Sequence, residues 1–364
     1  MHPRLRHYPH HRDYMDMRSE FRPYIMYTNQ PGYQSPSVNV DRFGFREQYD
    51  AQLRFMDLAR LRDTYRGCNL FVGSSTAFGV DATSDRATVP FYLNEPDIPF
   101  VNFGIRGALS QQEVMSFMLH KHLLPPIANI VLFTGVNGPS FAALEDTLYF
   151  EDFGGIFSEE FIFRRFWEIY RQFEDNQALN AKMRFQEALQ RWICNWYENS
   201  SIARTLASLL MLNSRRVPSQ TQRKPRLSFA EKLALVNRFF VNDLDTWKVI
   251  QRGTGCRIHF VLQPCIGWTN KKLTPIESEC FDEDMKLTPS MQAYTTMAMY
   301  NDYRKSVRQA CDQADIEFHD ANEWLNEPQF EKQDVFTDVC HLTDYGQLAL
   351  GDFLRHKLRW KNTE

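Results

Sequence analysis

The sequence lacks several features that would assign it to a broad class at once. No apolar run in its 364 residues approaches the roughly 18 residues that a membrane-spanning helix needs, so we expect no transmembrane segment. Residues 1–18, MHPRLRHYPHHRDYMDMR, contain no apolar stretch of the kind that a secretory signal requires. The 42 basic and 45 acidic residues give a formal net charge of -3, which argues against a nucleic-acid-binding protein with a net basic field.

The cysteines also lack a pattern. Seven are present, an odd number, and no two of them form a CxxC pair. Such a set in a chain of this length is typical of reduced thiols, so we expect a cytoplasmic protein without a disulfide framework. The seven are Cys68, Cys194, Cys256, Cys265, Cys280, Cys311 and Cys340.

Residues 1–62 form a leader that precedes the first buried strand. Its first part is polar and contains His2, His7, His10 and His11, whose spacing matches no standard zinc pattern, so we expect a frayed, solvated segment. Residues 26–47 are rich in Pro, Gly, Ser and Asn and predict an irregular but ordered segment. Residues 50–62 have helical spacing, and the apolar stripe of this predicted helix consists of Ala51, Phe55, Leu58 and Leu61.

A run of short apolar segments follows, each ending in small or polar residues. Continuous apolar runs of this length are typical of strands buried on both faces, which indicates a parallel sheet. The first three begin about 30 residues apart, which is the repeat of a βα unit. Between them, residues 109–123 have helical periodicity, and Ser110 with Glu113 forms a capping-box pattern. The five predicted strands are 69–73, 99–104, 129–135, 257–264 and 315–320.

The interval between the third and fourth strands is far longer than a crossover needs. Residues 157–212 have helical periodicity throughout, so we expect a helical insertion over about 150–234 that separates a sheet domain into residues 63–149 and 235–364. An aromatic stripe in it favours an insertion core over a ligand site. Residues 213–228 hold five basic residues and no acidic one; a solvated loop is the commoner case, and attraction of an anionic substrate or carrier protein is the alternative. Ser228 and Glu231 form a second capping pattern.

Four short blocks lie just past predicted strand ends, where an α/β sheet places its active site. Ser75 lies on a turn of small residues that can expose its Oγ atom and present backbone N–H groups. At Gly107 the backbone can come close to a reacting carbonyl group, because glycine has no side chain. The side-chain amide of Asn137 can donate a hydrogen bond to an oxyanion. Each of these is also an ordinary turn residue. Asp338 and His341 are three apart, so the carboxylate can orient the imidazole as a general base.

This ordered set resembles the SGNH hydrolases, also called the GDSL esterase/lipase superfamily. Gly73-Ser74-Ser75 is similar to the first block, with Ser74 in place of its usual Asp. Gly107 matches the glycine of the second block, Gly135-Val136-Asn137 matches Gly-x-Asn of the third, and Asp338-Val339-Cys340-His341 matches Asp-x-x-His. The usual Asp after the block-three asparagine is here Gly138. The resemblance covers about residues 66–138 and 235–355, and segments 39–46 and 260–264, with Lys271 and Glu277, also look familiar from bacterial members.

The resemblance implies a flavodoxin-like three-layer α/β/α fold with a five-stranded parallel sheet in the order 2-1-3-4-5. It also implies catalysis without a metal or cofactor, in which His341, oriented by Asp338, takes the proton of the Ser75 nucleophile. The backbone N–H groups of Ser75 and Gly107 and the side chain of Asn137 would form the oxyanion hole.

These residues favour a serine esterase acting on a short acyl ester of a carbohydrate or small metabolite. An acyltransferase or thioesterase using the same triad on an acyl carrier protein or coenzyme A donor is an alternative, and a non-catalytic ligand-binding protein of the same fold is a second one. Arg106 is a candidate for binding an anionic substrate group, although a surface ion pair is commoner. His319 lies at the end of the fifth predicted strand and is a candidate pocket residue, whereas His259 and Cys340 are expected to be buried core residues.

Overall fold

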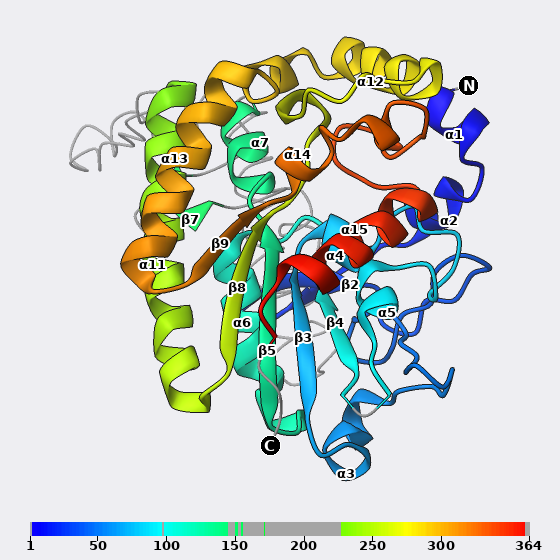
Figure 1. Cartoon of the computed structure of the whole chain (residues 1–364), viewed down its shortest axis with the longest axis vertical. Coiled ribbons are helices and arrows are strands. Elements are labelled where there is room, and N and C mark those ends of the chain that lie inside the picture. The colour runs from blue at the N-terminus through cyan, green and yellow to red at the C-terminus, as the bar shows by residue number, and fades with distance from the viewer. Residues whose placement is uncertain are drawn as a thin grey trace, which may run out of the picture. The chain divides into compact units, whose positions relative to one another are not determined.

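A computed structural model gives the fold (Figure 1) and describes residues 2–96, 98–144, 150–151, 154–155, 171 and 227–360. Almost all of them belong to one compact unit, Met1–Phe157 with Ser228–Glu364. Three predictions concern residues that lie almost entirely outside this description: the helical insertion, its aromatic stripe and the basic loop. Whether the insertion covers the site as a lid also concerns these residues. The three-part division of the chain therefore stays a prediction.

A five-stranded parallel sheet forms the centre of this unit. Its strands lie in the order β4-β3-β5-β8-β9, which is the order 2-1-3-4-5 along the chain, so the predicted fold class and topology are confirmed. The inner strands are built of apolar residues because helices cover both faces, and Leu70, Ile130 and Phe260 are fully buried. The bounds are β3 Cys68–Gly73, β4 Phe100–Gly104, β5 Ile127–Thr134, β8 Arg257–Leu262 and β9 Glu317–Asp320.

Helices cover the two faces of the sheet. One layer consists of α6 (Ser110–His120), α11 (Phe229–Thr254) and α13 (Met297–Ala314), and in it the Phe240 ring packs 5.3 Å from that of Phe260 in β8. The opposite layer consists of α5 (Val89–Leu93), α14 (Ala321–Trp324) and α15 (Asp344–Lys357), which crosses in front of the sheet in Figure 1. Leu350 and Leu354 of α15 share a buried cluster with Val131 and Val261 of the sheet.

The remaining elements are short, except for α12. They are α1 Pro3–His7, α2 His11–Asp16, β1 Ser19–Arg22, β2 Met26–Asn29, α3 Leu61–Thr64, α4 Ser75–Phe78, α7 Asn137–Ala143, β6 Phe150–Glu151, β7 Gly154–Gly155 and α12 Pro275–Leu287, with 3-10 turns at Leu58–Arg60, Lys121–Leu123, Ile266–Trp268, Pro289–Ala293 and Pro328–Phe330.

The leader is more ordered than its sequence predicted. Residues 2–17, which we call the N-terminal arm, contain two short helices, and their apolar residues Tyr14 and Met17 are only 2% and 3% exposed. The Tyr14 hydroxyl donates to the carbonyl of Ala82 at 2.6 Å. The expectation of a frayed, solvated segment is therefore wrong, because a few anchor residues bury themselves against the sheet domain.

Two local predictions are also wrong. The helix expected over 50–62 is reduced to the turn at Leu58–Arg60 and helix α3, because Asp50 Oδ1 accepts the N–H groups of Gln52 and Arg54 and closes a turn there. The capping box at Ser110 and Glu113 is absent, since tertiary partners take both side chains. The second box, Ser228 with Glu231, is confirmed at the start of α11.

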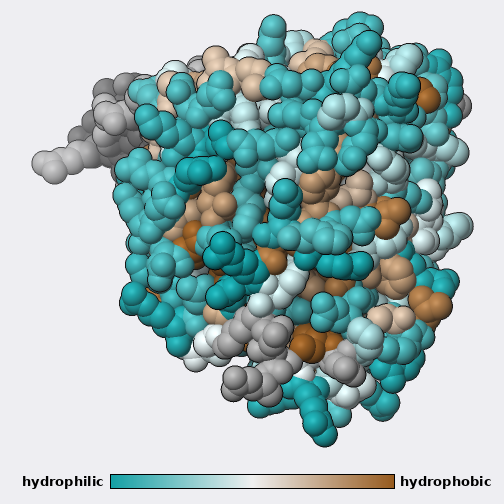
Figure 2. Space-filling view, in the orientation of Figure 1, coloured by the Kyte–Doolittle hydropathy of each residue, from teal (hydrophilic) through white to brown (hydrophobic). Residues whose placement is uncertain are grey.

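The surface visible in Figure 2 is mostly hydrophilic, with small separate apolar areas. Within the described residues, every helix is too short or too polar to cross a bilayer. Cys68, Cys265, Cys280, Cys311 and Cys340 are free thiols.

Candidate active site

The predicted blocks gather at one edge of the sheet. Gly73 is the last residue of β3 and pairs with Gly104, the last residue of β4, and with Phe133 near the end of β5. Parallel strands end at the same edge of a sheet. The turns that carry Ser75, Gly107 and Asn137, which come after β3, β4 and β5, therefore lie next to one another.

Ser75 is the first residue of α4, so its backbone N–H has no acceptor within that helix. The turn before it requires glycine, since a Cβ atom on Gly73 would lie 2.1 Å from the Phe133 carbonyl oxygen. The helix ends after one turn at Gly79, whose φ of +84° is left-handed. Arg46 of the leader is buried and donates to the Gly79 carbonyl at 2.6 Å, and so anchors the end of this helix.

The second and third blocks lie next to each other. Gly107 has a φ of +73°, which other residues adopt only with strain, and turns the chain after β4. Asn137 opens α7, and its side-chain amide donates to the carbonyl of Ala108 at 2.8 Å. This bond fixes the orientation of the amide. It does so although Gly138 replaces the aspartate that usually follows the asparagine of this block. The second amide hydrogen remains for another acceptor.

Asp338 and His341 form a hydrogen-bonded dyad. His341 Nδ1 lies 2.6 Å from Asp338 Oδ2, while Asp338 Oδ1 accepts the N–H groups of Cys340 at 2.9 Å and of His341 at 2.7 Å. Burial alone would raise the pKa of Asp338, but the Arg4 and His341 charges and these hydrogen bonds hold it well below its usual range. The carboxylate is therefore ionised and orients the ring through Nδ1.

The other ring nitrogen of His341, Nε2, is not bonded to the turn that carries Ser75. Nε2 is buried and has no hydrogen-bond partner among the described residues, so the Ser75–His341 hydrogen bond is not formed in this structure. The two loops are nevertheless joined through their neighbours, since the Thr76 hydroxyl donates to the Cys340 carbonyl at 3.4 Å. Gln263, fully buried at the end of β8, donates to the Thr76 hydroxyl at 2.9 Å. Hydrogen bonds to catalytic groups are often long in enzymes without substrate.

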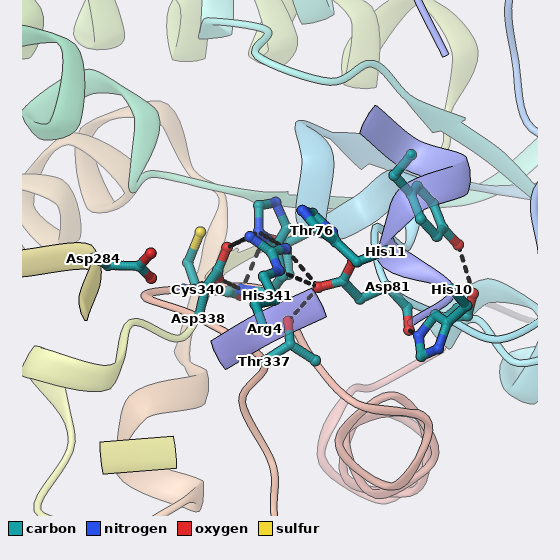
Figure 3. Close-up of polar contacts among 12 residues, drawn as sticks. Arg4, His10, His11, Thr76, Asp81, Asp284, Thr337, Asp338, Cys340 and His341 are labelled. Carbon is teal, nitrogen blue, oxygen red and sulfur yellow. Dashed lines mark hydrogen bonds and ion pairs between the residues drawn. The ribbon is translucent and has the colours of Figure 1, made fainter. Parts of the chain in front are cut away.

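The N-terminal arm brings a buried cation to the dyad (Figure 3). Arg4 forms ion pairs with Asp338 and with Asp81, whose Oδ2 lies 2.7 Å from Arg4 Nε, and the guanidinium approaches His341 Nδ1 at 3.2 Å. Asp81 has a fully buried carboxylate that also accepts from Thr337 at 2.5 Å and contacts His11 at 2.6 Å. Burial would raise the pKa of Asp81, but Arg4 and His11 lower it well below its usual range.

Arg4 therefore forms ion pairs with two buried carboxylates, one of which orients the His341 ring. Sequence reasoning missed both Arg4 and Asp81. Neither lies in a recognisable motif, and Arg4 is separated from His341 by 337 positions. The one local signal was the proline at the start of α1, which favours a helix there.

A buried ion pair supports the loop before Asp338. Lys271 and Glu277 are 6% and 1% exposed, and Lys271 Nζ lies 2.5 Å from Glu277 Oε2. The other carboxylate oxygen of Glu277 accepts the N–H groups of Val335 at 2.8 Å and Phe336 at 3.1 Å. These two charged residues were noticed in the sequence only through the resemblance, and the structure gives them a supporting contact to the dyad loop.

Another buried carboxylate, that of Glu113, lies behind the third block. Glu113 accepts a hydrogen bond from Thr134 at 2.8 Å, and burial raises its pKa to about 8. The Ser110 hydroxyl lies 2.5 Å from Asp243, whose pKa burial raises to about 7. Glu113 is therefore protonated in the folded protein at neutral pH.

This protonation predicts a loss of stability as pH rises from about 4.5 to about 8. The folded state binds a proton on Glu113 that the unfolded chain has released above about pH 4.5, so the free energy of unfolding falls as pH rises to about 8. We expect Glu113→Gln to remove on the order of 2–4 kcal/mol of that fall between pH 5 and pH 8. Urea unfolding at several pH values measures it. Glu231→Gln, in an exposed capping position, is the control and should leave the slope unchanged; an equal slope in wild type and Glu113→Gln would contradict the prediction.

The side chains of the two candidate substrate residues, Arg106 and His319, contact other parts of the protein. Arg106 donates to the carbonyls of Tyr14 at 2.7 Å and Met17 at 2.6 Å, so it secures the N-terminal arm, and the surface ion pair is not what the described residues show. The His319 ring packs 5.7 Å from that of His259, the third residue of β8, rather than beside the dyad.

Asp338, Cys340 and His341 lie close enough together to suggest a metal site. The Cys340 thiol does not support one, because burial and the Asp338 charge raise its pKa well above its usual range. Arg4 and His341 already occupy the Asp338 carboxylate. The arrangement suits an acid–base pair better than a metal site, and a protonated Cys340 thiol is a poor nucleophile.

Comparison with protein-family models gives no match, and comparison with curated proteins gives none either. Solved structures with remote similarity include the acetyl xylan esterase AlAXEase, at 12% identity and a TM-score of 0.37 over 78% of this chain and 96% of that one. A mutant of the acetyl-xylooligosaccharide esterase Axe2 from Geobacillus stearmophilus has 12% identity and a TM-score of 0.37 over 82% and 97%. An extracellular lipase from Streptomyces rimosus has 11% identity and a TM-score of 0.35 over 79% and 99%. These similarities are too remote to assign a family.

Proposed function

We propose that the chain is a serine esterase of the SGNH type that hydrolyses a short acyl ester of a carbohydrate or small metabolite. The observation that carries this proposal is the Asp338–His341 dyad at 2.6 Å, with the neighbouring loop hydrogen-bonded to the turn of Ser75. Its ionised carboxylate and free Nε2 atom are what a general base for a serine alcohol requires.

The reaction begins with proton transfer from Ser75 Oγ to His341 Nε2 as Oγ attacks the ester carbonyl. The tetrahedral oxyanion accepts hydrogen bonds from the backbone N–H groups of Ser75 and Gly107 and from the free amide hydrogen of Asn137. The carbon–oxygen bond to the alcohol then breaks, and the leaving alkoxide takes the proton from His341. This leaves an acyl-serine.

Deacylation repeats these steps with water. His341 Nε2 removes a proton from a water molecule as its oxygen attacks the acyl carbonyl, and the same donors stabilise the second oxyanion. The bond to Ser75 Oγ breaks, the proton returns to Oγ, and the carboxylic acid leaves. Asp338 stays ionised throughout and stabilises the imidazolium form of His341.

Arg4 has a supporting role in this scheme. It contacts Asp338 on the same oxygen atom as His341 and compensates the neighbouring charge of Asp81, so it holds the Asp338 carboxylate in place. It does not contact the reacting atoms in the proposed steps, and we regard it as a positioning residue.

Mass spectrometry of the intact protein after treatment with a fluorophosphonate tests the proposal, because this reagent labels a serine only when a base activates it. We expect one adduct on the wild type and none on Ser75→Ala. Ser74→Ala is the matched control: Ser74 is the adjacent residue, fully buried, and should leave labelling intact. An unlabelled wild type would overturn the proposal and favour a ligand-binding protein of this fold. Labelling that survives in Ser75→Ala would overturn the assignment of Ser75 as the nucleophile.

A further inference from the structure

Two histidines and a glutamate meet on the face of the sheet that α15 covers, away from the dyad. His259 of β8 pairs with Glu317 of β9, and His319 is two residues further along β9, so all three side chains point to the same face. The side chain of His259 is fully buried, that of His319 is 14% exposed, and that of Glu317 is 39% exposed. In this cluster the histidine side chains are therefore shielded from solvent, whereas the Glu317 carboxylate is accessible to it.

The distances in this cluster fit the ligands of a single metal ion. His259 Nδ1 lies 3.3 Å from Glu317 Oε2, and His319 Nε2 lies 3.5 Å from Glu317 Oε1. All three residues offer ligand atoms within 4.8 Å of one another. A tetrahedral zinc ion with bonds of 2.0–2.1 Å separates its ligand atoms by about 3.3 Å.

The ring nitrogens at this place are poorly satisfied. Within the described residues, both ring nitrogens of His259 and Nε2 of His319 are buried and lack a hydrogen bond of normal geometry; their polar neighbours are the Glu317 oxygens and, for His259, the backbone of Arg359. Buried polar atoms of folded proteins are almost always satisfied, so unpartnered ones call for an explanation.

We propose that His259, Glu317 and His319 bind one divalent transition-metal ion of the zinc class, with water in the fourth position. Two imidazoles and a carboxylate suit zinc, cobalt or nickel rather than calcium or magnesium, which prefer oxygen ligands. The ion would fasten β9, the short edge strand, to β8. Arg257 on the same face of β8 donates to the Arg359 carbonyl, and the Trp360 ring packs 5.6 Å from His259, so the C-terminal segment closes over the buried side.

Titration of the full chain with Co²⁺, followed by visible absorption, tests this site. Cobalt replaces zinc in such sites, and its d–d absorption distinguishes four-coordinate from six-coordinate binding. We expect one equivalent of tightly bound, four-coordinate Co²⁺ on the wild type. Glu317→Gln and His319→Ala should each weaken binding at least 10-fold and remove the four-coordinate spectrum.

Other histidines bind Co²⁺ in the absence of a built site, so the controls decide the result. His7→Ala, in the N-terminal arm, and His356→Ala, exposed on α15, should bind Co²⁺ as the wild type does. Ser75→Ala should too, because this site is independent of the proposed reaction. Glu317→Gln changes only a half-exposed side chain and guards against a folding defect in His319→Ala. A wild type without a four-coordinate spectrum, or one whose spectrum survives in Glu317→Gln and His319→Ala, would overturn the proposal.

Discussion

Replacing Asp338 by asparagine is expected to lower kcat for a chromogenic ester such as 4-nitrophenyl acetate by about 10³–10⁴-fold, with KM nearly unchanged. An asparagine in this place donates rather than only accepts, so it favours the ring tautomer of His341 that carries its proton on Nε2. That tautomer cannot accept the proton of Ser75. The loss therefore falls on the chemical steps and not on substrate binding.

The control for this experiment is Asp284→Asn. Asp284 is a second carboxylate in the same region (Figure 3), where burial and the charge of Asp338 raise its pKa to about 7. The described structure shows no hydrogen bond from it to His341, so we expect its replacement to change kcat only a few-fold. Equal losses in the two variants would mean that the region needs negative charge in general, and would contradict the dyad.

Replacing Arg4 by methionine is expected to cost about 3–5 kcal/mol in the free energy of unfolding at pH 7, because it leaves the Asp81 and Asp338 carboxylates buried without their counter-charge. Arg6→Met is the matched control. Arg6 lies in the same helix but is 52% exposed, and its partner Glu279 is also exposed, so we expect no measurable change. Urea unfolding of the three proteins gives the comparison.

The cost of Arg4→Met should depend on pH in a defined direction. The folded-state pKa values of Asp81 and Asp338 lie below the unfolded value of about 3.9, so their stabilising contribution is complete above about pH 5 and is lost as pH falls through the folded values. The difference between wild type and variant should be largest at pH 6–8 and shrink below pH 4. A difference that is constant with pH, or equal stability of Arg4→Met and Arg6→Met, would contradict the ion-pair account.

The sheet and the dyad were predictable because their signals are local. Each strand is a continuous apolar run that ends in small residues, and Asp338 and His341 are close enough in sequence to meet on one turn. The same local reasoning failed at Ser110 and Glu113. Instead of forming a capping box, Ser110 is hydrogen-bonded to Asp243 and Glu113 to Thr134. A pattern of two side chains cannot reveal a partner that lies far along the chain.

The N-terminal arm illustrates the same limit more strongly. Its histidines and arginines read as a solvated segment because nothing near them in sequence is apolar enough to bury them. Their partners are single residues far along the chain, such as Asp81 and Asp338, and Arg106 accounts for much of the anchoring through backbone carbonyls. Arg106 itself was expected to face a substrate or an ion pair, since an arginine beside a glycine turn does not indicate which acceptors lie around it.

The contact between Arg4 and His341 also sets the order in which the site is completed during synthesis. The two residues are 337 positions apart, so at about 5–20 residues per second a ribosome makes Arg4 roughly 20–70 seconds before His341. During that interval Asp81 is made and β3 can pair with β4, while the surroundings of Ser75 still lack the general base. Asp338 and His341 are made last, whereas Arg4, the cation beside them, is made first. For most of its synthesis the nascent chain therefore carries Ser75 without the residue that we propose as its base.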